Sequence, residues 1–344
     1  MDKNIELFCQ NLANETGISF PPSRYTFILN RLSPLLEKYN CRDLSDLIRI
    51  GKNNFELKMA ITNVLTTNET WFFRHPEQFE ILKTYVLPEL IKRKSDKTLS
   101  IWSAGCSIGA ELYSILITVL EAIPSSANYR LNLLGSDISY DAITIAKKGI
   151  YDSRELRATD RTILEKYFHQ LSSNTYQVKD ELKAKVNFEY LNLMGNWPPR
   201  TFDIILCRNT MIYFNESSKK NLITRLFKAL NINGYFFTSA NEQVYINEGN
   251  FSIKKLFINN EVVYKKLNQI SKSWELFFKT PSDLLKTINF LRKNSYTFNY
   301  GQATAGTKGS QIRSLIISDA DYDTIIKNLA FNSIELLKTV CIKS

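Results

Sequence analysis

The chain has 344 residues, 44% of them hydrophobic and 23% charged, so it can bury a core and is long enough for two or three domains. This composition excludes a disordered chain, a collagen and a coiled coil. No uninterrupted apolar run approaches the roughly 18 residues of a membrane helix, and acids and amides occupy the N-terminus, where a signal peptide would be apolar. We therefore expect a soluble, cytoplasmic protein without membrane insertion.

The net charge of +10 is spread along the chain. Residues 1–75 carry 9 basic and 8 acidic side chains, and residues 266–344 carry 11 and 6. No block of five or six like charges occurs, which favours a solvated basic surface over a nucleic-acid site. The five cysteines are scattered without a CxxC pair, and the only histidines are His75 and His169. This pattern predicts neither a disulfide framework nor a metal site, and it leaves little room for catalysis by imidazole.

Residues 1–75 are predicted to form a helical N-terminal domain and a linker. Within 23–40, Ile28, Leu32 and Leu35 recur at helical spacing, and the segments 42–51 and 54–67 show the same pattern.

From Thr98 onward, short apolar runs alternate with helix-like segments at 111–123 and 218–232. This alternation predicts an α/β domain over residues 76–267, built on a mostly parallel sheet. The last two strands should form an antiparallel hairpin at its edge, and the polar stretch at about 155–185 predicts a small insertion. The predicted strands are 99–105, 131–137, 186–192, 202–209, 234–240, 251–257 and 261–267.

Residues 268–344 are predicted to form a C-terminal extension. It contains helix candidates at 281–293 and 321–340, and the stretch 301–310 is typical of a flexible linker.

The most informative segment is a strand that ends at Ala104, followed by the loop Gly105–Gly109 and a helix. Such a loop lets a ligand approach the backbone closely. The next strand ends at Asp137, where a carboxylate can accept hydrogen bonds from both ribose hydroxyls of a nucleoside. Neither a GxxxxGK[ST] motif nor the full GxGxxG set is present. A nucleoside cofactor without a pyrophosphate fits best, and S-adenosylmethionine is such a cofactor.

Five ordered motifs support a family resemblance: TNETWFFR (67–74), IWSAGCSIGAELYS (101–114), GSDIS (135–139), FEYLNL (188–193) and CRNTMIYF (207–214). Through roughly residues 15–265 the chain resembles the chemotaxis receptor methyltransferases (CheR), which esterify glutamate side chains of chemoreceptors. The resemblance implies an all-helical N-terminal domain followed by a class I, Rossmann-like, S-adenosylmethionine-dependent methyltransferase domain with a small β insertion.

The resemblance also implies roles for ten residues. Asn68, Thr70 and Arg74 match the segment between the domains that closes over cofactor and substrate. Cofactor contacts are implied for Glu111 at the methionine amine, Asp137 at the ribose, Asn192 and Leu193 beside the adenine, and Arg208 and Asn209 beneath the cofactor. Tyr213 matches a position near the methyl transfer.

The implied reaction explains the scarcity of histidine. A glutamate is already ionised at neutral pH, so it can attack the sulfonium methyl without a general base. Arg74 and Tyr213 would then act as catalytic donors that position the carboxylate. The implied partners are the cytoplasmic domains of chemoreceptors, with Arg24, Arg31 and Lys38 as candidate contacts, and the implied state is a monomer.

Two departures from the family pattern keep alternatives open. Gly109-Ala110-Glu111 keeps one of two usual acids, and residues 239–242 replace a GHSE-like turn. One alternative is a methyltransferase of another substrate, such as nucleic acid or a small molecule. A (D/N/S)PP(Y/F) motif would support nucleic acid, but residues 196–200 are only a loose echo that precedes the fourth strand. The other alternative is a cofactor-binding sensor or adaptor without turnover.

Overall fold

The structure is a computed structural model that describes residues 3–66, 69–123, 129–242, 244 and 252–267 of one compact unit, Met1–Leu267. A second unit, Asn268–Ser344, is described at 272–278, 281–293, 298–300, 304–305, 311–312, 314–318, 325–326 and 336–343. None of the helices in these ranges combines the length and apolar character that a membrane crossing needs.

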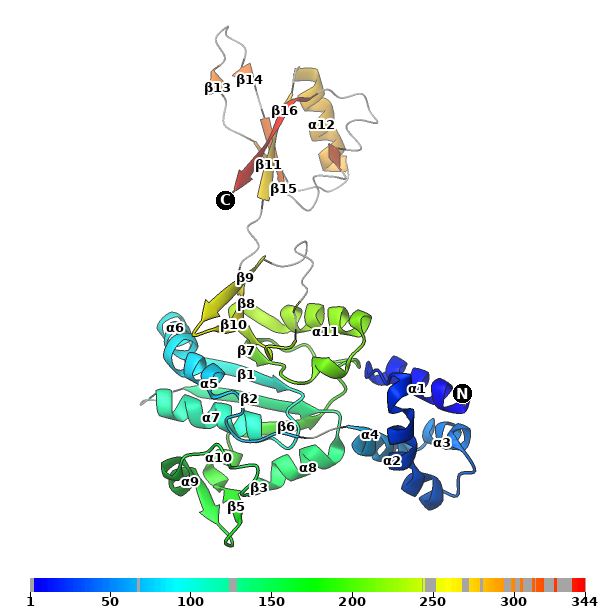
Figure 1. Ribbon diagram of the computed structural model, residues 1–344. Coiled ribbons are helices and arrows are strands. Elements are labelled where there is room, and N and C mark those ends of the chain that lie inside the picture. The colour runs from blue at the N-terminus through cyan, green and yellow to red at the C-terminus, as the bar shows by residue number, and fades with distance from the viewer. Residues whose placement is uncertain are drawn as a thin grey trace. The chain divides into compact units, whose positions relative to one another are not determined.

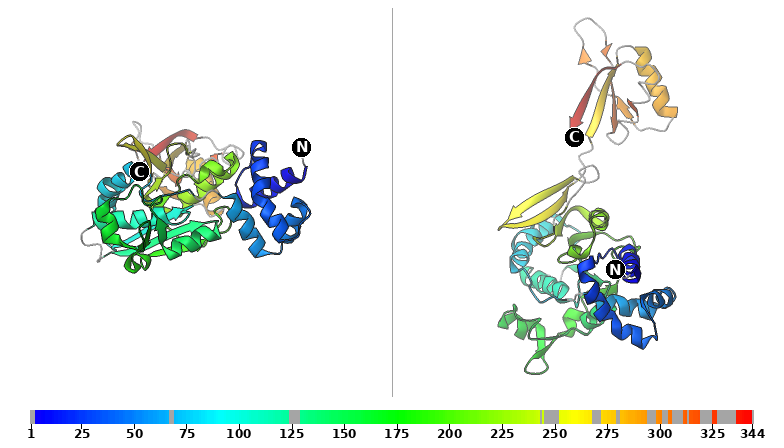
Figure 2. Two further views of the ribbon diagram at one scale, coloured as in Figure 1. Left: turned by 60° about the horizontal axis from the view of Figure 1, so that its bottom comes forward. Right: turned by 45° about the vertical axis from the view of Figure 1, so that its right-hand side comes forward.

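The N-terminal part of the first unit is helical, as predicted. Its helices are α1 (Lys3–Thr16), α2 (Tyr25–Lys38), α3 (Leu44–Gly51) and α4 (Phe55–Leu65), with a 3-10 turn at Pro22–Arg24. Ile28, Leu32 and Leu35 lie in its core, and α1, which the sequence analysis did not identify, adds Ile5 and Phe8. The side chains of Asp43 and Asn54 cap α3 and α4 by accepting hydrogen bonds from backbone N–H groups in the first turn of each helix. Figure 2 shows these helices as a bundle beside the α/β part.

A seven-stranded sheet of order β6-β2-β1-β7-β8-β10-β9 forms the α/β part (Figure 1). The first five strands in this order are parallel, while β10 pairs antiparallel with both β8 and β9, which confirms the predicted mostly parallel sheet and its hairpin edge. The strands are β1 (Thr98–Ala104), β2 (Arg130–Asp137), β6 (Val186–Tyr190), β7 (Phe202–Leu206), β8 (Leu230–Phe237), β9 (Ser252–Ile258) and β10 (Glu261–Leu267).

Helices cover both faces of this sheet because alternate side chains of its strands point to opposite faces. On one face, Ile101 and Ile204 pack with α5 (Pro76–Ile81), a π-helical turn (Leu82–Val86), α6 (Leu87–Arg93), α7 (Ala110–Ala122) and α8 (Tyr140–Lys148). On the other face, Trp102 and Ile205 pack with α11 (Glu216–Ala229). The parallel strands are therefore apolar on both sides and end at a common edge.

A three-stranded antiparallel sheet of order β3-β5-β4 follows α8 and forms the small β insertion. It consists of β3 (Ile150–Asp152), β4 (Phe168–Gln170) and β5 (Thr175–Val178), with the short helices α9 (Arg161–Tyr167) and α10 (Asp180–Lys183).

The second unit contains a four-stranded antiparallel sheet, β12-β15-β11-β16, and the predicted helix at 281–293, which is α12 (Pro281–Lys293). The helix prediction for 321–340 is wrong over 336–340, because β16 (Leu336–Lys343) pairs with β11 (Lys272–Phe278) along its length. In the predicted linker at 301–310, Thr304–Ala305 forms β13, which pairs with β14 (Gln311–Ile312), and the rest lies outside the described residues. The remaining strands are β12 (Phe298–Tyr300) and β15 (Ser314–Ser318).

Candidate functional site

The glycine loop after β1 lies at the carboxyl edge of the sheet. Gly105 has a φ of +84°, and a β-carbon there would lie 2.2 Å from Oγ1 of Thr210. The backbone N–H groups of Gly105 and Cys106 both donate to the carbonyl of Ser136 on β2. Only glycine combines this backbone conformation with such a close approach between loops.

Asp137, at the end of β2, is a buried carboxylate held by two backbone amides. Its oxygens accept hydrogen bonds from the N–H groups of Ser107 and Ser139, each at 2.8 Å. Burial raises the pKa of Asp137, and the amide hydrogen bonds oppose that rise by favouring the ionised form. The carboxylate is thereby fixed beside the glycine loop, where it can meet a ribose.

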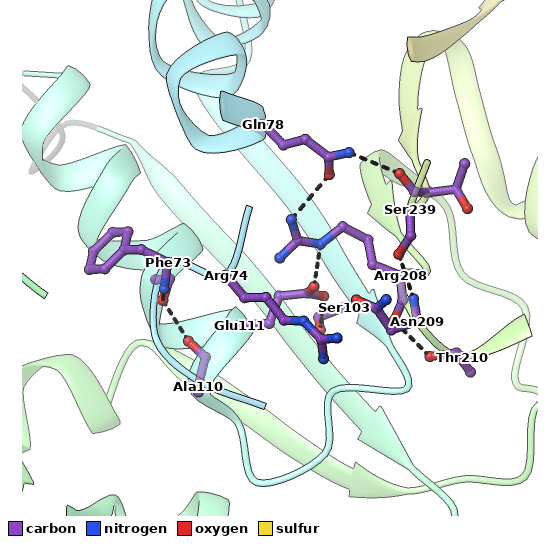
Figure 3. Close-up of polar contacts among 12 residues, drawn as sticks. Phe73, Arg74, Gln78, Ser103, Ala110, Glu111, Arg208, Asn209, Thr210 and Ser239 are labelled. Atoms are coloured by element: carbon purple, nitrogen blue, oxygen red, sulfur yellow. Dashed lines mark hydrogen bonds and ion pairs between the residues drawn. The ribbon is translucent and has the colours of Figure 1, made fainter. Parts of the chain in front are cut away.

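Glu111, in the first turn of α7, is anchored in a buried polar cluster (Figure 3). Its carboxylate accepts hydrogen bonds from Oγ of Ser103 at 2.7 Å and from Nε of Arg208 at 2.6 Å. Nη1 of Arg208 donates to Gln78, which in turn donates to the carbonyl of Thr238. Arg208 therefore neutralises Glu111 and ties the end of β7 to the helices that precede β1.

The segment after Arg208 forms the remaining strand-end contacts. Asn209 has a φ of +54°, and its N–H donates to Oγ of Ser239 at 2.8 Å and to Oε2 of Glu242 at 2.9 Å. A 3-10 turn, Met211–Tyr213, follows and brings Tyr213 to the same edge. We call Gly105–Ser107, Asp137 and Arg208–Thr210 the strand-end wall.

Residues 69–75, the linker segment, are anchored on one side by Phe72. This ring is fully buried among Tyr113, Tyr151 and Phe168, and the N–H of Phe73 donates to Oγ of Ser114. The anchoring fixes the backbone from which Arg74 extends.

Arg74 itself is held by few polar contacts. Its guanidinium lies 4.4 Å from the Trp71 ring centroid and donates to the carbonyl of Glu69 at 3.0 Å. Nε of Arg74 and Nε2 of His75 are buried without a partner. Burial lowers the pKa of both side chains. Phe73 and His75, on either side of Arg74, have φ values of +55° and +63°, which are strained for such residues.

The loop after β6 carries Asn192 and Leu193. Oδ1 of Asn192 accepts the N–H of Met194, and its amide donates to the carbonyl of Glu15 in α1 at 2.8 Å. Arg225 of α11 holds the loop from outside, donating to the carbonyls of Leu193 and Gly195. Its guanidinium lies 4.0 Å from the ring centroid of Trp197, whose indole N–H also donates to Leu193.

These elements enclose one cavity of about 1000 Å³, including its mouth toward solvent. Nine of the ten predicted residues line it: Thr70, Arg74, Glu111, Asp137, Asn192, Leu193, Arg208, Asn209 and Tyr213. Asn68 lies outside the described residues. The helical domain closes one side with residues that the sequence analysis did not assign to the cofactor: Thr16, Ile18, Phe20, Arg24, Leu65 and Thr66.

Three supporting residues, Gln78, Arg225 and Glu242, were not predicted to serve this site. Gln78 and Arg225 carry no sequence signal because their partners lie 130 and 32 residues away along the chain. Glu242 had one signal, its place in the turn that replaces the family's GHSE-like turn.

The residues present fit S-adenosylmethionine. The glycine loop and Glu111 follow β1, Asp137 ends β2, and all of them line the cavity. Arg74 of the linker segment lines it too, and its Nε is buried without a partner. When bound, the cofactor supplies an electrophilic methyl group on a sulfonium.

Comparisons with known proteins agree with this geometry. Residues 68–259 match the family model for the SAM-binding domain of CheR methyltransferases, and residues 3–66 match the model for the all-alpha CheR domain. Chemotaxis protein methyltransferase 1 of Vibrio cholerae is 32% identical over 275 residues, covering 77% of this chain and 97% of that protein. A probable chemotaxis protein methyltransferase of Rhizobium etli is 37% identical over 239 residues, covering 67% of this chain and 89% of that protein. With both domains matched in order, the chain belongs to the CheR methyltransferase family.

Proposed function

We propose that this enzyme methylates glutamate side chains of chemoreceptors, using S-adenosylmethionine as the methyl donor. The observation that carries the proposal is that Arg74 and Tyr213 line the same cavity as the predicted cofactor residues. An arginine remains charged at neutral pH even when burial lowers its pKa, so Arg74 can attract and orient a carboxylate.

The reaction needs no proton transfer. A lone pair of the glutamate oxygen attacks the sulfonium methyl, a C–O bond forms as the C–S bond breaks, and the electron pair stays on sulfur. The products are a neutral methyl ester and S-adenosylhomocysteine. The task of the protein is therefore to align three atoms and exclude water, and neither histidine is required as a base.

The residues that line the cavity would divide this task. Asp137, Glu111 and the Asn192 loop would hold the cofactor, while Arg74 and Tyr213 would hold the incoming carboxylate. Arg24, at the start of α2, lines the same cavity and would favour acidic peptide sequence near its mouth. We further propose that the enzyme works as a monomer in the cytoplasm, on the cytoplasmic domains of receptors.

The direct test is to incubate the purified protein with methyl-labelled S-adenosylmethionine and receptor-containing membranes, and then to treat the receptor band with base. Release of the label as volatile methanol is expected, because carboxyl methyl esters are base-labile. A base-stable label would point to another acceptor atom. Cofactor binding without any label on receptors would overturn the receptor assignment and favour a different substrate or a sensor.

A further inference from the structure

Glu242 is a buried carboxylate that none of the roles above uses. It lies in the turn after β8, is only 6% exposed and does not line the cavity. Within its own turn it accepts hydrogen bonds from Oγ1 of Thr238 at 3.0 Å and from the N–H of Ser239 at 3.1 Å. These two bonds fix the orientation of its side chain.

The same carboxylate also accepts two hydrogen bonds from the segment after β7. Oε2 accepts the N–H of Asn209 at 2.9 Å, and Oε1 accepts the N–H of Ile212 at 3.2 Å. The two amides lie at opposite ends of the turn that leads from the strand-end wall into the 3-10 turn ending at Tyr213. The side chain of Glu242 thus spans the turn that joins the strand-end wall to Tyr213.

Burial of the Glu242 carboxylate costs free energy that its hydrogen bonds must offset. Burying a carboxylate is unfavourable, and the four donors described here are neutral, so hydrogen bonds to neutral groups must offset the loss of hydration. The backbone it holds is also unfavourable, since Asn209 adopts a left-handed φ. Glu242 supplies the bonds that make this conformation the stable one.

We propose that Glu242 is a positioning residue for methyl transfer, acting through Tyr213 by fixing the turn from Asn209 to Tyr213. This inference rests on the proposed function of Tyr213. The turn after β8 differs from the usual family pattern, but Glu242 retains the acceptor that the segment after β7 requires.

Glu242→Gln tests the proposal because it preserves size but replaces one acceptor oxygen by an NH₂ group. At least one of the two backbone amides, of Asn209 or of Ile212, must then lose its hydrogen bond to this side chain. We expect kcat to fall by about 10- to 100-fold, as for other lost positioning interactions, while the dissociation constant for S-adenosylmethionine changes by less than about fivefold. A purely structural role would not produce this split.

A double-mutant cycle with Tyr213→Phe separates positioning from general damage. If Glu242 acts through Tyr213, Glu242→Gln should cost less than about threefold in kcat once Tyr213 is already phenylalanine. Equal costs in both backgrounds would overturn the proposal. Glu121→Gln is the matched control, since Glu121 also accepts two side-chain hydrogen bonds, from Lys166 and Tyr167, but lies at the far end of α7. It should leave kcat unchanged in both backgrounds.

Amide hydrogen exchange provides a readout that does not depend on the substrate. At least one of the amides of Asn209 and Ile212 should exchange at least about tenfold faster in Glu242→Gln than in the wild type, and unchanged exchange at both would contradict the proposal. If Glu242→Gln does not fold, Glu242→Asp keeps the charge but is too short to reach both amides, and the same loss and non-additivity are expected. If the wild type forms no ester on receptors, the proposed function fails, while the exchange data still decide whether Glu242 holds the turn.

Discussion

The strand-end wall of the cavity is held by hydrogen bonds to Asp137, Glu111 and Glu242. In the linker segment, which lines the same cavity, buried nitrogens of Arg74 and His75 have no partners. The two sides also differ in how their unusual backbone conformations are supported. The N–H of Asn209 donates to Ser239 and Glu242, but the side chain of His75, the N-cap residue of α5, makes no capping hydrogen bond.

This difference indicates which side is complete before ligands bind. Because the strand-end wall already has its internal hydrogen bonds, it needs little reorganisation when a ligand binds, which favours tight and specific binding. In the linker segment, the buried Nε–H of Arg74 has no acceptor, which costs free energy. A bound carboxylate could accept this hydrogen bond and remove the cost. We therefore expect changes to the strand-end wall to weaken cofactor binding, and changes to the linker segment to impair methyl transfer.

The largest effect on cofactor binding should come from Gly105→Ala. The left-handed backbone costs a residue with a β-carbon about 1–2 kcal/mol, and the new carbon would meet Oγ1 of Thr210 at 2.2 Å. Together these should weaken S-adenosylmethionine binding by about 100-fold or more, measured by calorimetry. Gly51→Ala is the control, because its β-carbon would lie 3.8 Å from the nearest atom, an ordinary van der Waals contact, and it should bind normally. Normal binding by Gly105→Ala would mean that the strand-end wall can move to accommodate the β-carbon despite its hydrogen bonds.

The complementary experiment is Arg74→Ala in the linker segment. If Arg74 orients the reacting carboxylate as proposed, its loss should lower kcat/KM by about 10²- to 10³-fold, with cofactor affinity less affected and the melting temperature changed by only a few degrees. Arg157→Ala is a matched control, since Arg157 also stacks on Trp71, at 3.8 Å, but does not line the cavity. Full activity of Arg74→Ala would refute the catalytic assignment.

A smaller effect is expected from Arg225→Lys, behind the Asn192–Leu193 loop. Lysine cannot span two carbonyls while stacking on Trp197, so the loop should loosen and the cofactor should bind about tenfold more weakly. Arg200→Lys alters a surface pair with Glu189 and should leave affinity unchanged. The two dissociation constants can be compared in one titration series, and equal values would show that the loop needs no support from α11.

The smallest effect concerns acid sensitivity at His75. Burial, with Arg208 and Arg74 nearby, lowers its pKa below the usual 6.5, although Glu261 and Glu77 act in the opposite sense. As the pH falls through 6.5, the unfolded chain therefore binds a proton that the folded chain resists, and the free energy of unfolding decreases. His75→Asn, which tolerates a left-handed backbone, should be less acid-sensitive in urea titrations between pH 7 and 5. Parallel curves for both proteins would exclude His75 as the source.

The sequence predicted the parts of this molecule that depend on local pattern or on motif order. Apolar runs identified the strands of the seven-stranded sheet, and the motifs placed nine side chains that line one cavity. The prediction failed where pairing across the chain decides the outcome, as when β16 forms against β11 in place of a helix at 336–340. The supporting roles of Arg225 and Glu242 could not be predicted, because their hydrogen-bond partners become neighbours only when the sheet is assembled.

Gly17 illustrates a consequence of sharing a cavity between domains. A β-carbon on Gly17, which follows α1, would collide with the Phe214 ring and with Met194, both on the α/β side, and the backbone N–H of Ser19 donates to the carbonyl of Tyr213. The helical domain is therefore not an interchangeable module. When these enzymes diverge, residues 16–20 and the turn at 213–214 must change in concert, so a hybrid that joins the helical domain of one relative to the catalytic domain of another should function only when it carries both segments from the same parent.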